Sequence, residues 1–342
     1  MSKNNTDPIL SVVVPLFNEQ DNIDLLVSRL TDSLSEIGLS YEIVLVDDGS
    51  KDDTWDNIQT ACVRHPFIRA VRFSRNFGHQ HAIFAGLKAA KGQAIVSMDG
   101  DLQHPPEVIG SLVREWESGY KIVNTIREDQ EVAGPIKRLC SKTFYKIFSI
   151  LSDVSLQKGS SDFRLIDRQV RDEIISFADM DVFLRGAIQW VGFDVKDVTF
   201  TAEARHQGTT KFTFGRMNRL ATGAIISYST VPLKIGVWLG GVTSFLSFCE
   251  LGYIFYIHTK GVTVPGWAST IGITSLLFGV LFFNIGIIGI YLARIHESLQ
   301  GRPPYIVSED CASGVIKPSA NQLHHAAVVQ KRVARKDYDP SI

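Results

Sequence analysis

Two long apolar runs, 235–257 and 270–293, place the strongest constraint on how this chain of 342 residues can fold. Glu250 is the only charged residue in the first run, and the second run has none. At a rise of about 1.5 Å per residue, each run as a helix is about 35 Å long, and the apolar core of a bilayer is about 30 Å thick. The sequence therefore predicts two transmembrane helices.

The charges that flank these runs predict an orientation. The linker between the runs contains one lysine, whereas basic residues gather before the first run and after the second. These are Lys211, Arg216, Arg219, Lys234, Arg294 and Arg302. The positive-inside rule then places the large N-terminal part and the C-terminal tail in the cytoplasm. We expect a multi-pass protein of the inner (cell) membrane with both termini cytoplasmic.

The first 130 residues alternate short β-branched segments with segments of helical periodicity. The strand-like segments are "ILSVVVP" (9–15), "YEIVLVDD" (41–48), "IRAVRFS" (68–74), "QAIVSMD" (93–99) and "YKIVNTI" (120–126). Nearly continuous apolar strands separated by helices are typical of a mostly parallel sheet with helices on both faces. The predicted fold class is therefore α/β, followed by the two-helix anchor.

Polar clusters follow four of these strands. They are "PLFNE", "DDGSKDD", "RNFGH" and "DGDLQ". Ligands of such sheets bind beyond the carboxyl ends of the strands, so the four clusters predict one active-site cleft. No G-x-G-x-x-G follows the first strand and no P-loop motif occurs, which argues against a dinucleotide or P-loop site.

The fourth cluster contains two aspartates, Asp99 and Asp101, one residue apart. In an extended chain their side chains lie on the same side, about 7 Å apart, and their charges repel. A divalent cation would offset this repulsion, and with the amide of Gln103 the set suits Mg²⁺ or Mn²⁺. The alternative is a capped turn in which Asp101 or His104 starts a helix at Pro105.

Composition adds two exclusions. The net charge of −1 gives no indication of nucleic-acid binding. The four cysteines are scattered without metal-ligand spacing, which argues against structural zinc and a disulfide framework and fits a reducing compartment.

The segments 136–152 and 214–232 have apolar faces flanked by basic residues, including Arg138. This pattern is typical of helices lying in a membrane interface, although an amphipathic core helix reads similarly. The predicted organisation is a nucleotide-binding half at 1–135 and an acceptor-side region at 136–230. A membrane anchor at 231–300 and a cytoplasmic tail at 301–342 follow, and residues 308–342 of this tail are expected to be basic and weakly ordered.

Seven motifs in a fixed order resemble a known family. They are "VVVPLFNE", "VDDGSKD", "SRNFGHQHAIFAGL", "MDGDLQHPPE", "DFRLIDR", "FLRG" and "RHQGTTKF". With two C-terminal spans, they resemble the inverting family 2 glycosyltransferases that act on polyprenyl phosphates. This group includes bactoprenol glucosyltransferases and dolichol-phosphate mannose synthases. The resemblance covers roughly residues 9–307 and implies a GT-A nucleotide-sugar fold with a divalent metal.

The resemblance also implies roles for individual residues. Asp99, Asp101 and Gln103 would hold the metal, with Asp101 counted as catalytic. The nucleotide sugar would contact Pro15, Phe17, Glu19, Asp48, Asp99, Arg205 and Lys211. Arg127 and Arg138 would bind the acceptor phosphate, and Asp162 and Arg205 would complete the catalytic set. Since a phosphate monoester is largely ionised at neutral pH, Asp162 either removes a proton or orients the acceptor or another cation. We interpret His79 and His81 as cleft or structural residues.

The implied activity is transfer of a hexose, glucose from UDP-glucose in the first instance, to undecaprenyl phosphate. Its partners would be the nucleotide-sugar donor, the lipid acceptor and the membrane, without nucleic acid, and the sequence leaves a homo-oligomer open. Three alternatives stay open: a GDP-mannose-dependent mannose synthase, a modified-pentose transferase, and a non-catalytic scaffold or flippase accessory.

Overall fold

The computed structural model describes residues 7–127, 160–176, 184–201, 231–260, 266–312 and 315–318. These residues belong to two compact units. The α/β unit contains the described residues up to 201 and those from 303 onward, and the helical unit contains 231–260 and 266–302.

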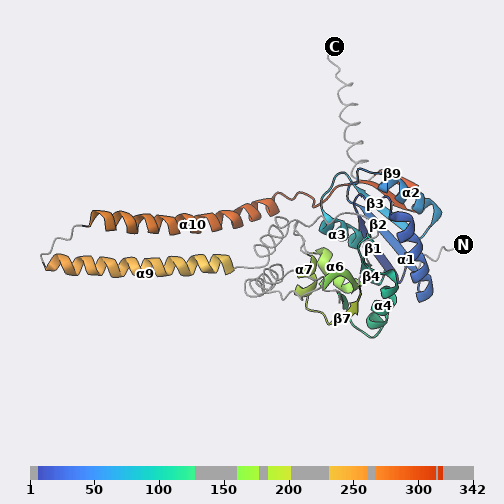
Figure 1. Cartoon of the computed structure of the whole chain (residues 1–342), viewed down its shortest axis with the longest axis horizontal. Helices are drawn as coiled ribbons and strands as arrows, with labels where there is room; N and C mark the ends of the chain where they lie inside the picture. The colour runs from blue at the N-terminus through green and yellow to red at the C-terminus, as the bar shows by residue number, and fades with distance from the viewer. Residues whose placement is uncertain are drawn as a thin grey trace, which may run out of the picture. The chain divides into compact units, whose positions relative to one another are not determined.

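The α/β unit is built on one nine-stranded sheet with the order β7-β5-β6-β4-β1-β2-β3-β8-β9 in the described residues (Figure 1). The strands are β1 (Leu10–Leu16), β2 (Tyr41–Asp47), β3 (Ile68–Phe73), β4 (Ala94–Ser97), β5 (Ile122–Arg127), β6 (Ser160–Asp167), β7 (Val195–Phe200), β8 (Val307–Ala312) and β9 (Val315–Pro318). All of these strands except β6 and β8 run in the same direction. The predicted, mostly parallel α/β sheet is confirmed.

Helices cover both faces of the sheet because successive strand residues point to opposite sides. Val12 and Val14 of β1 pack in a cluster with α1, α2 and α4, whereas Val13 packs in a second cluster with α3, α6 and α7. The helices are α1 (Ile23–Ile37), α2 (Thr54–Arg64), α3 (His79–Ala89), α4 (Ile109–Glu117), α6 (Arg168–Ser176) and α7 (Leu184–Trp190), with a short 3₁₀ turn at Pro106–Val108 before α4.

Strand β6 lies between β4 and β5 in the sheet. The segment expected at 120–126 forms β5, but it does not pair with β4, because β6 lies between them and runs antiparallel to both. Ser97 of β4 and Asn124 of β5 both face Arg164 of β6. A shift in register between Asn124 and Ile126 marks a bulge beside the site.

The expectation that residues 308–342 are weakly ordered is wrong for 308–312 and 315–318, because β8 and β9 lie there and extend the sheet beyond β3. Glu309 fixes this strand: its carboxylate accepts hydrogen bonds from Trp55 Nε1 at 3.1 Å and Arg72 Nη1 at 3.1 Å. Cys311 is fully buried and packs in the same core cluster as Cys62. The polar composition of β8 therefore concealed a strand in which the Glu309 carboxylate is hydrogen-bonded to the neighbouring residues of the unit.

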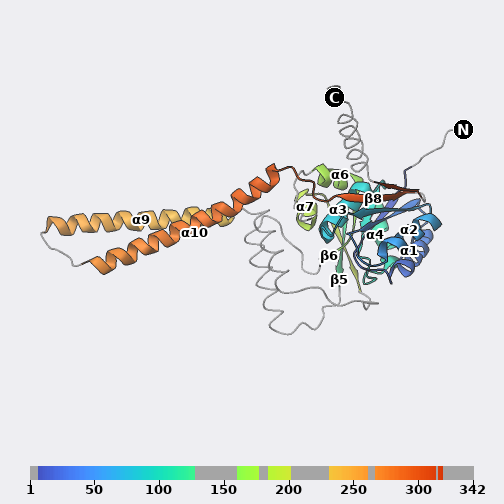
Figure 2. The same cartoon turned by 90° about the horizontal axis from the view of Figure 1, so that it is seen from above.

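The helical unit contains α9 (Val231–Thr259) and α10 (Trp267–Leu299), which lie side by side in both views (Figures 1 and 2). By length and composition, 233–257 and 270–299 are candidate membrane spans, and almost all of their side chains lie on the surface. A Cβ added at Gly236 of α9 would collide with the side-chain oxygen of Asn284 of α10. A small residue therefore allows close approach of the two helices, which is also common between helices in membranes. Most of the expected interfacial segments, 136–152 and 214–230, lies outside the described residues.

Gly86 provides a test of the packing between α3 and the sheet. An added Cβ would collide with Val13 Cγ1 and lie 3.2 Å from Val46 Cγ2. Although alanine normally stabilises a helix interior, we expect Gly86→Ala to destabilise the α/β unit by about 1–3 kcal/mol through overpacking. The matched control is Gly110→Ala in α4, whose added Cβ meets nothing nearer than 3.7 Å. Melting temperatures of the full chain in detergent measure both, and an unchanged value for Gly86→Ala would contradict the packing.

Asp167 provides a test of pH dependence. Burial alone would raise its pKa, but Trp116 Nε1 at 2.9 Å, the Gln169 amide at 2.9 Å and Lys121 Nζ at 3.1 Å lower its pKa below the ordinary value. A depressed folded-state pKa stabilises the protein above the unfolded pKa, and this contribution is lost as the pH falls. We expect Asp167→Asn to lower the melting temperature at pH 7 and the difference to shrink below about pH 4. A difference that stays constant down to pH 2.5 would contradict this.

Candidate active site

The site lies where the carboxyl ends of β1, β2, β4 and β5 meet the start of β6. Pro15 is buried near the end of β1 and lies beyond the last residue of β1 that pairs with β4. Proline has no N–H to donate, but at this position the sheet loses no hydrogen bond to β4. Phe17 and Glu19 follow in the loop after β1, where the Glu19 carboxylate accepts from Asn22 Nδ2 at 2.6 Å. All three expected nucleotide-side residues therefore lie at this edge.

Asp48, expected to contact the nucleobase, is an anchor for the loop after β3. Its two oxygens accept from Asn76 Nδ2 at 2.8 Å, Phe77 N at 2.7 Å and Gly78 N at 3.0 and 3.2 Å. Burial raises the pKa of Asp48 despite these bonds. Contact with a base stays a prediction, and the bonds that the structure gives Asp48 hold Gly78, the residue before α3.

The neighbouring Asp47 closes a turn, since its Oδ1 accepts from Ser50 N at 2.9 Å and its Oδ2 lies 3.3 Å from Arg72 Nε. It shapes the loop after β2.

The loop after β4 carries Asp99, Asp101 and Gln103. Asp101 Oδ1 accepts from Gln103 N at 3.2 Å, and Leu102 between them has φ +61° with its side chain buried. A leucine in the left-handed region is uncommon, and such strain is often found at functional sites. The 3₁₀ turn begins only at Pro106 and has no side-chain cap. Pro105 is the residue before this 3₁₀ turn, whereas Asp101 closes a turn of its own through the Gln103 amide.

His104 fixes this loop to β6. Its Nδ1 accepts from Asp99 N at 3.0 Å, so a neutral ring carries its proton on Nε2 and donates to Ser161 Oγ at 2.8 Å. The ring also stacks on Phe163 with centroids 5.1 Å apart. These contacts hold the backbone of Asp99.

Asp162 lies at the start of β6 and is surrounded by donors. Arg185 of α7 binds it with Nε at 2.8 Å and Nη2 at 2.9 Å, and Gln80 Nε2 lies at 3.2 Å. Arg164 Nη2 lies at 3.5 Å. Burial alone would raise its pKa, but Arg185, His79 and Arg164 hold the pKa of Asp162 well below its usual range. A carboxylate so stabilised as the anion is a weak base.

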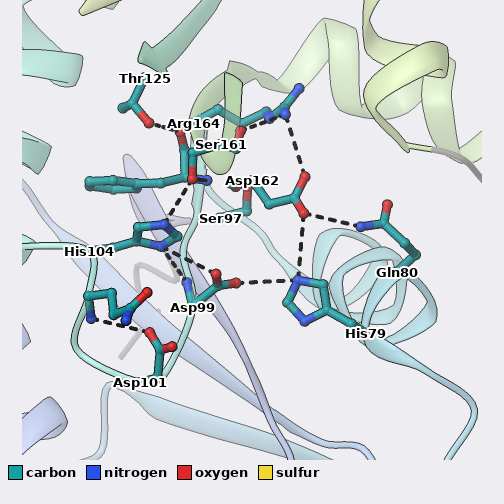
Figure 3. A network of polar contacts seen from close by, with 12 residues as sticks. His79, Gln80, Ser97, Asp99, Asp101, His104, Thr125, Ser161, Asp162 and Arg164 are labelled. Carbon is teal, nitrogen blue, oxygen red and sulfur yellow. Dashed lines mark hydrogen bonds and ion pairs between the residues drawn. The ribbon is translucent and has the colours of Figure 1, made fainter. Parts of the chain in front are cut away.

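His79, the first residue of α3, lies between the two carboxylates (Figure 3). Its Nε2 lies 3.3 Å from Asp99 Oδ1 and 3.7 Å from Asp162 Oδ2. Burial alone would lower its pKa, but the two carboxylates raise the pKa of His79 to about 10. For Asp99, burial is likewise outweighed by His79 and His104, so its pKa falls below the ordinary value.

The donor set fits a divalent cation that also binds a ligand. Among the described residues, no three His, Cys, Asp or Glu side chains form a ready-made cage. Asp99 Oδ1 is nevertheless buried without a hydrogen bond, since His79 makes only an ion-pair contact with it. Mg²⁺ is commonly bound by one or two carboxylates together with substrate phosphates. Asp99, Asp101 and Gln103 supply the hard oxygen donors for such a site.

The expected cations are only partly described. Arg127 is the last residue of β5, at the predicted rim, and its Nε is buried without a hydrogen-bond partner in the described part of the chain. Arg138, Arg205 and Lys211 lie outside the described residues. The sequence did not predict the contacts of His79, His104 and Arg185, although all three residues lie within the family motifs quoted above.

The comparisons with known proteins identify the class. The family profile described as "Glycosyl transferase family 2" matches residues 11–177. A glycosyltransferase of Synechocystis sp. is 38% identical over 301 residues, covering 88% of this chain and 95% of the relative. A prophage-derived bactoprenol glucosyl transferase of Shigella flexneri is 34% identical, covering 88% and 97%, and a prophage bactoprenol glucosyl transferase homolog of Escherichia coli is 34% identical, covering 87% and 98%.

Solved structures are more distant. Glucosyl-3-phosphoglycerate synthase of Mycobacterium tuberculosis, in complex with Mn²⁺, UDP and glucosyl-3-phosphoglycerate, is 19% identical with a TM-score of 0.44, covering 64% of this chain and 79% of that chain. A mannosyltransferase of Pyrobaculum calidifontis with GDP-mannose and Mn²⁺ is 15% identical with a TM-score of 0.42, covering 86% and 88%.

The chain belongs to glycosyl transferase family 2, as the motifs predicted, and is a glycosyltransferase with the α/β GT-A fold.

The hydrogen bonds of His104 can be separated from its packing. His104→Phe keeps a ring against Phe163 but leaves the Asp99 N–H and the Ser161 hydroxyl without their partner. We expect a loss of about 1–3 kcal/mol, measured as a lower melting temperature, because buried polar groups become unsatisfied. His65→Phe, at the end of α2, is the matched control and should be nearly neutral. His104→Phe as stable as the wild type would show that packing alone matters.

Proposed function

We propose that this glycosyltransferase moves a hexose from a nucleotide sugar to a polyprenyl phosphate, with UDP-glucose and undecaprenyl phosphate as the first candidates. The observation that carries the proposal is the Asp99–Asp101 pair, held in a strained loop with one buried carboxylate oxygen that lacks a hydrogen bond. The relatives named bactoprenol glucosyl transferases, matched over nearly their whole length, support the acceptor class.

Asp99, Asp101 and Gln103 would hold a Mg²⁺ or Mn²⁺ ion. When bound, the ion would neutralise the negative charge of the departing nucleoside diphosphate. Pro15, Phe17 and Glu19 lie at the same edge of the sheet, where we place the nucleoside. Arg205 and Lys211 are proposed to contact the donor phosphates on the basis of their motif.

The acceptor phosphate needs cations more than it needs a base. A phosphate monoester has a second pKa near 6 and is largely ionised at neutral pH, so its oxygen can attack the anomeric carbon directly. Arg127, at the end of β5, is proposed to bind this phosphate together with Arg138. The engaged carboxylate of Asp162 supports an orienting role over proton removal. In-line attack would invert the anomeric centre, and the protein would contribute positioning and charge stabilisation.

The two candidate spans explain why such an enzyme would be anchored. The acceptor headgroup lies at the bilayer surface, so attaching the α/β unit to the same membrane raises its effective concentration. The flanking basic residues support a cytoplasmic α/β unit and a cell-membrane location. Two alternative activities use the same chemistry with another donor: a mannose synthase that uses GDP-mannose, and a transferase of a modified pentose.

The test uses the purified full chain, undecaprenyl phosphate, Mn²⁺ and labelled UDP-glucose or GDP-mannose in separate reactions, followed by lipid extraction. We expect label in the lipid with UDP-glucose. Label from GDP-mannose alone would correct the donor, and no labelled lipid from any nucleotide sugar would favour the non-catalytic alternative.

Asp101→Asn should reduce this transfer at least about 100-fold, because a metal contributes several kcal/mol of charge stabilisation. The matched control is Asp53→Asn, an exposed aspartate before α2 that makes no side-chain cap. We expect its transfer rate to equal that of the wild type. Wild-type transfer by Asp101→Asn would contradict the proposed role of the pair.

A further inference from the structure

His79 is the one side chain that Figure 3 shows reaching both Asp99 and Asp162. A single atom, Nε2, makes both contacts, at 3.3 Å to Asp99 Oδ1 and 3.7 Å to Asp162 Oδ2. Imidazole Nε2 carries one proton at most, so a single N–H faces two carboxylates, and both contacts are ion-pair contacts.

Asp162 is itself fixed in place. Arg185 binds both of its oxygens in the bidentate geometry that gives the greatest directional control, and Gln80, the neighbour of His79 on α3, donates to Oδ2. The backbone carbonyl of Asp162 also accepts from Ser97 Oγ at 2.7 Å. Asp162 is therefore an immobile acceptor against which the His79 ring can be oriented.

Asp99 is held on its other side by His104. The His104 ring accepts from the Asp99 backbone, and its Nδ1 lies 3.7 Å from Asp99 Oδ2. His104 thus sets the backbone, whereas His79 faces Oδ1, the oxygen without a hydrogen bond. Contacts of this kind around a ligating carboxylate set its direction, and removing them elsewhere costs about 10–100-fold in metal affinity.

We propose that His79 is a positioning residue for the metal site: supported by the Arg185–Asp162 pair, it sets the direction of the Asp99 carboxylate. This inference rests on the proposed function. In this proposal the negative charge of Asp162 stabilises the positions of His79 and Arg185. The histidine of the "RNFGH" motif then has a role in the same site.

The test is a Mn²⁺ titration of the purified full chain with UDP, followed by the electron paramagnetic resonance signal of free Mn²⁺. We expect His79→Ala to raise the dissociation constant of Mn²⁺ by about tenfold or more, and His79→Gln, whose amide N–H can take the place of Nε2–H, to recover most of the affinity. His65→Ala, remote from the site, should match the wild type. Equal or tighter binding by His79→Ala would overturn the proposal.

A positioning role also separates metal affinity from turnover. His79→Ala should need more Mn²⁺ for half-maximal transfer, while its rate at saturating Mn²⁺ stays near the wild-type rate. If Asp162 acts through His79, Asp162→Asn weakens Mn²⁺ binding in the same direction, and the double variant is no weaker than His79→Ala. Additive losses would overturn the link to Asp162. Should Asp162→Asn not fold, the two His79 variants alone decide.

The same measurements distinguish a failure of the proposed function from a failure of the proposed role of His79. A wild-type chain that binds no Mn²⁺ in the presence of UDP and transfers no sugar contradicts the proposed function. A wild-type chain that does both, while His79→Ala binds Mn²⁺ equally well, contradicts only the role of His79.

Discussion

The antiparallel pairing of β6 with β4 is the constraint on which the site depends. In the register that places Ser97 opposite Arg164, the start of β6 meets the end of β4, and the hydroxyl of Ser97 bonds the carbonyl of Asp162. If β6 ran parallel to β4, its C-terminal end, and not its N-terminal end, would lie at the cleft. The pairing therefore decides that Asp162, Arg164 and Ser161 stand beside the loop of Asp99.

Charge is distributed unequally among the three carboxylates of this cleft. Asp162 is neutralised by the protein itself, through Arg185 and Arg164. The buried Arg164 has its own pKa lowered to about 10, mainly by burial, yet it stays charged at neutral pH. In the ion pairs of the described residues, Asp99 faces His79 and His104, and its Oδ1 has no hydrogen bond. A cleft that balances Asp162 with two arginines and leaves an Asp99 oxygen without a hydrogen bond is suited to binding a metal together with a diphosphate.

Much of this could be predicted from the sequence, and the remainder fails for physical reasons. The apolar strands and the polar clusters after them are local patterns, so the parallel sheet and the Asp99–Asp101 loop were predicted. The position of β6 depends on pairing between residues far apart in the chain, which no periodicity encodes. The strand β8 was hidden because Glu309 is paired with Trp55 and Arg72 rather than exposed. The contacts of His79 were not predicted because its partners, Asp99 and Asp162, come from other segments of the chain.

The central claim is that Asp99 and Asp101 together bind a cation that also contacts the donor diphosphate. Anomalous diffraction at the manganese edge, from crystals of the full chain grown with UDP and Mn²⁺, measures this directly. The account predicts one anomalous peak within coordination distance of both carboxylates and of the diphosphate oxygens. A bound diphosphate with no manganese beside either aspartate would contradict it.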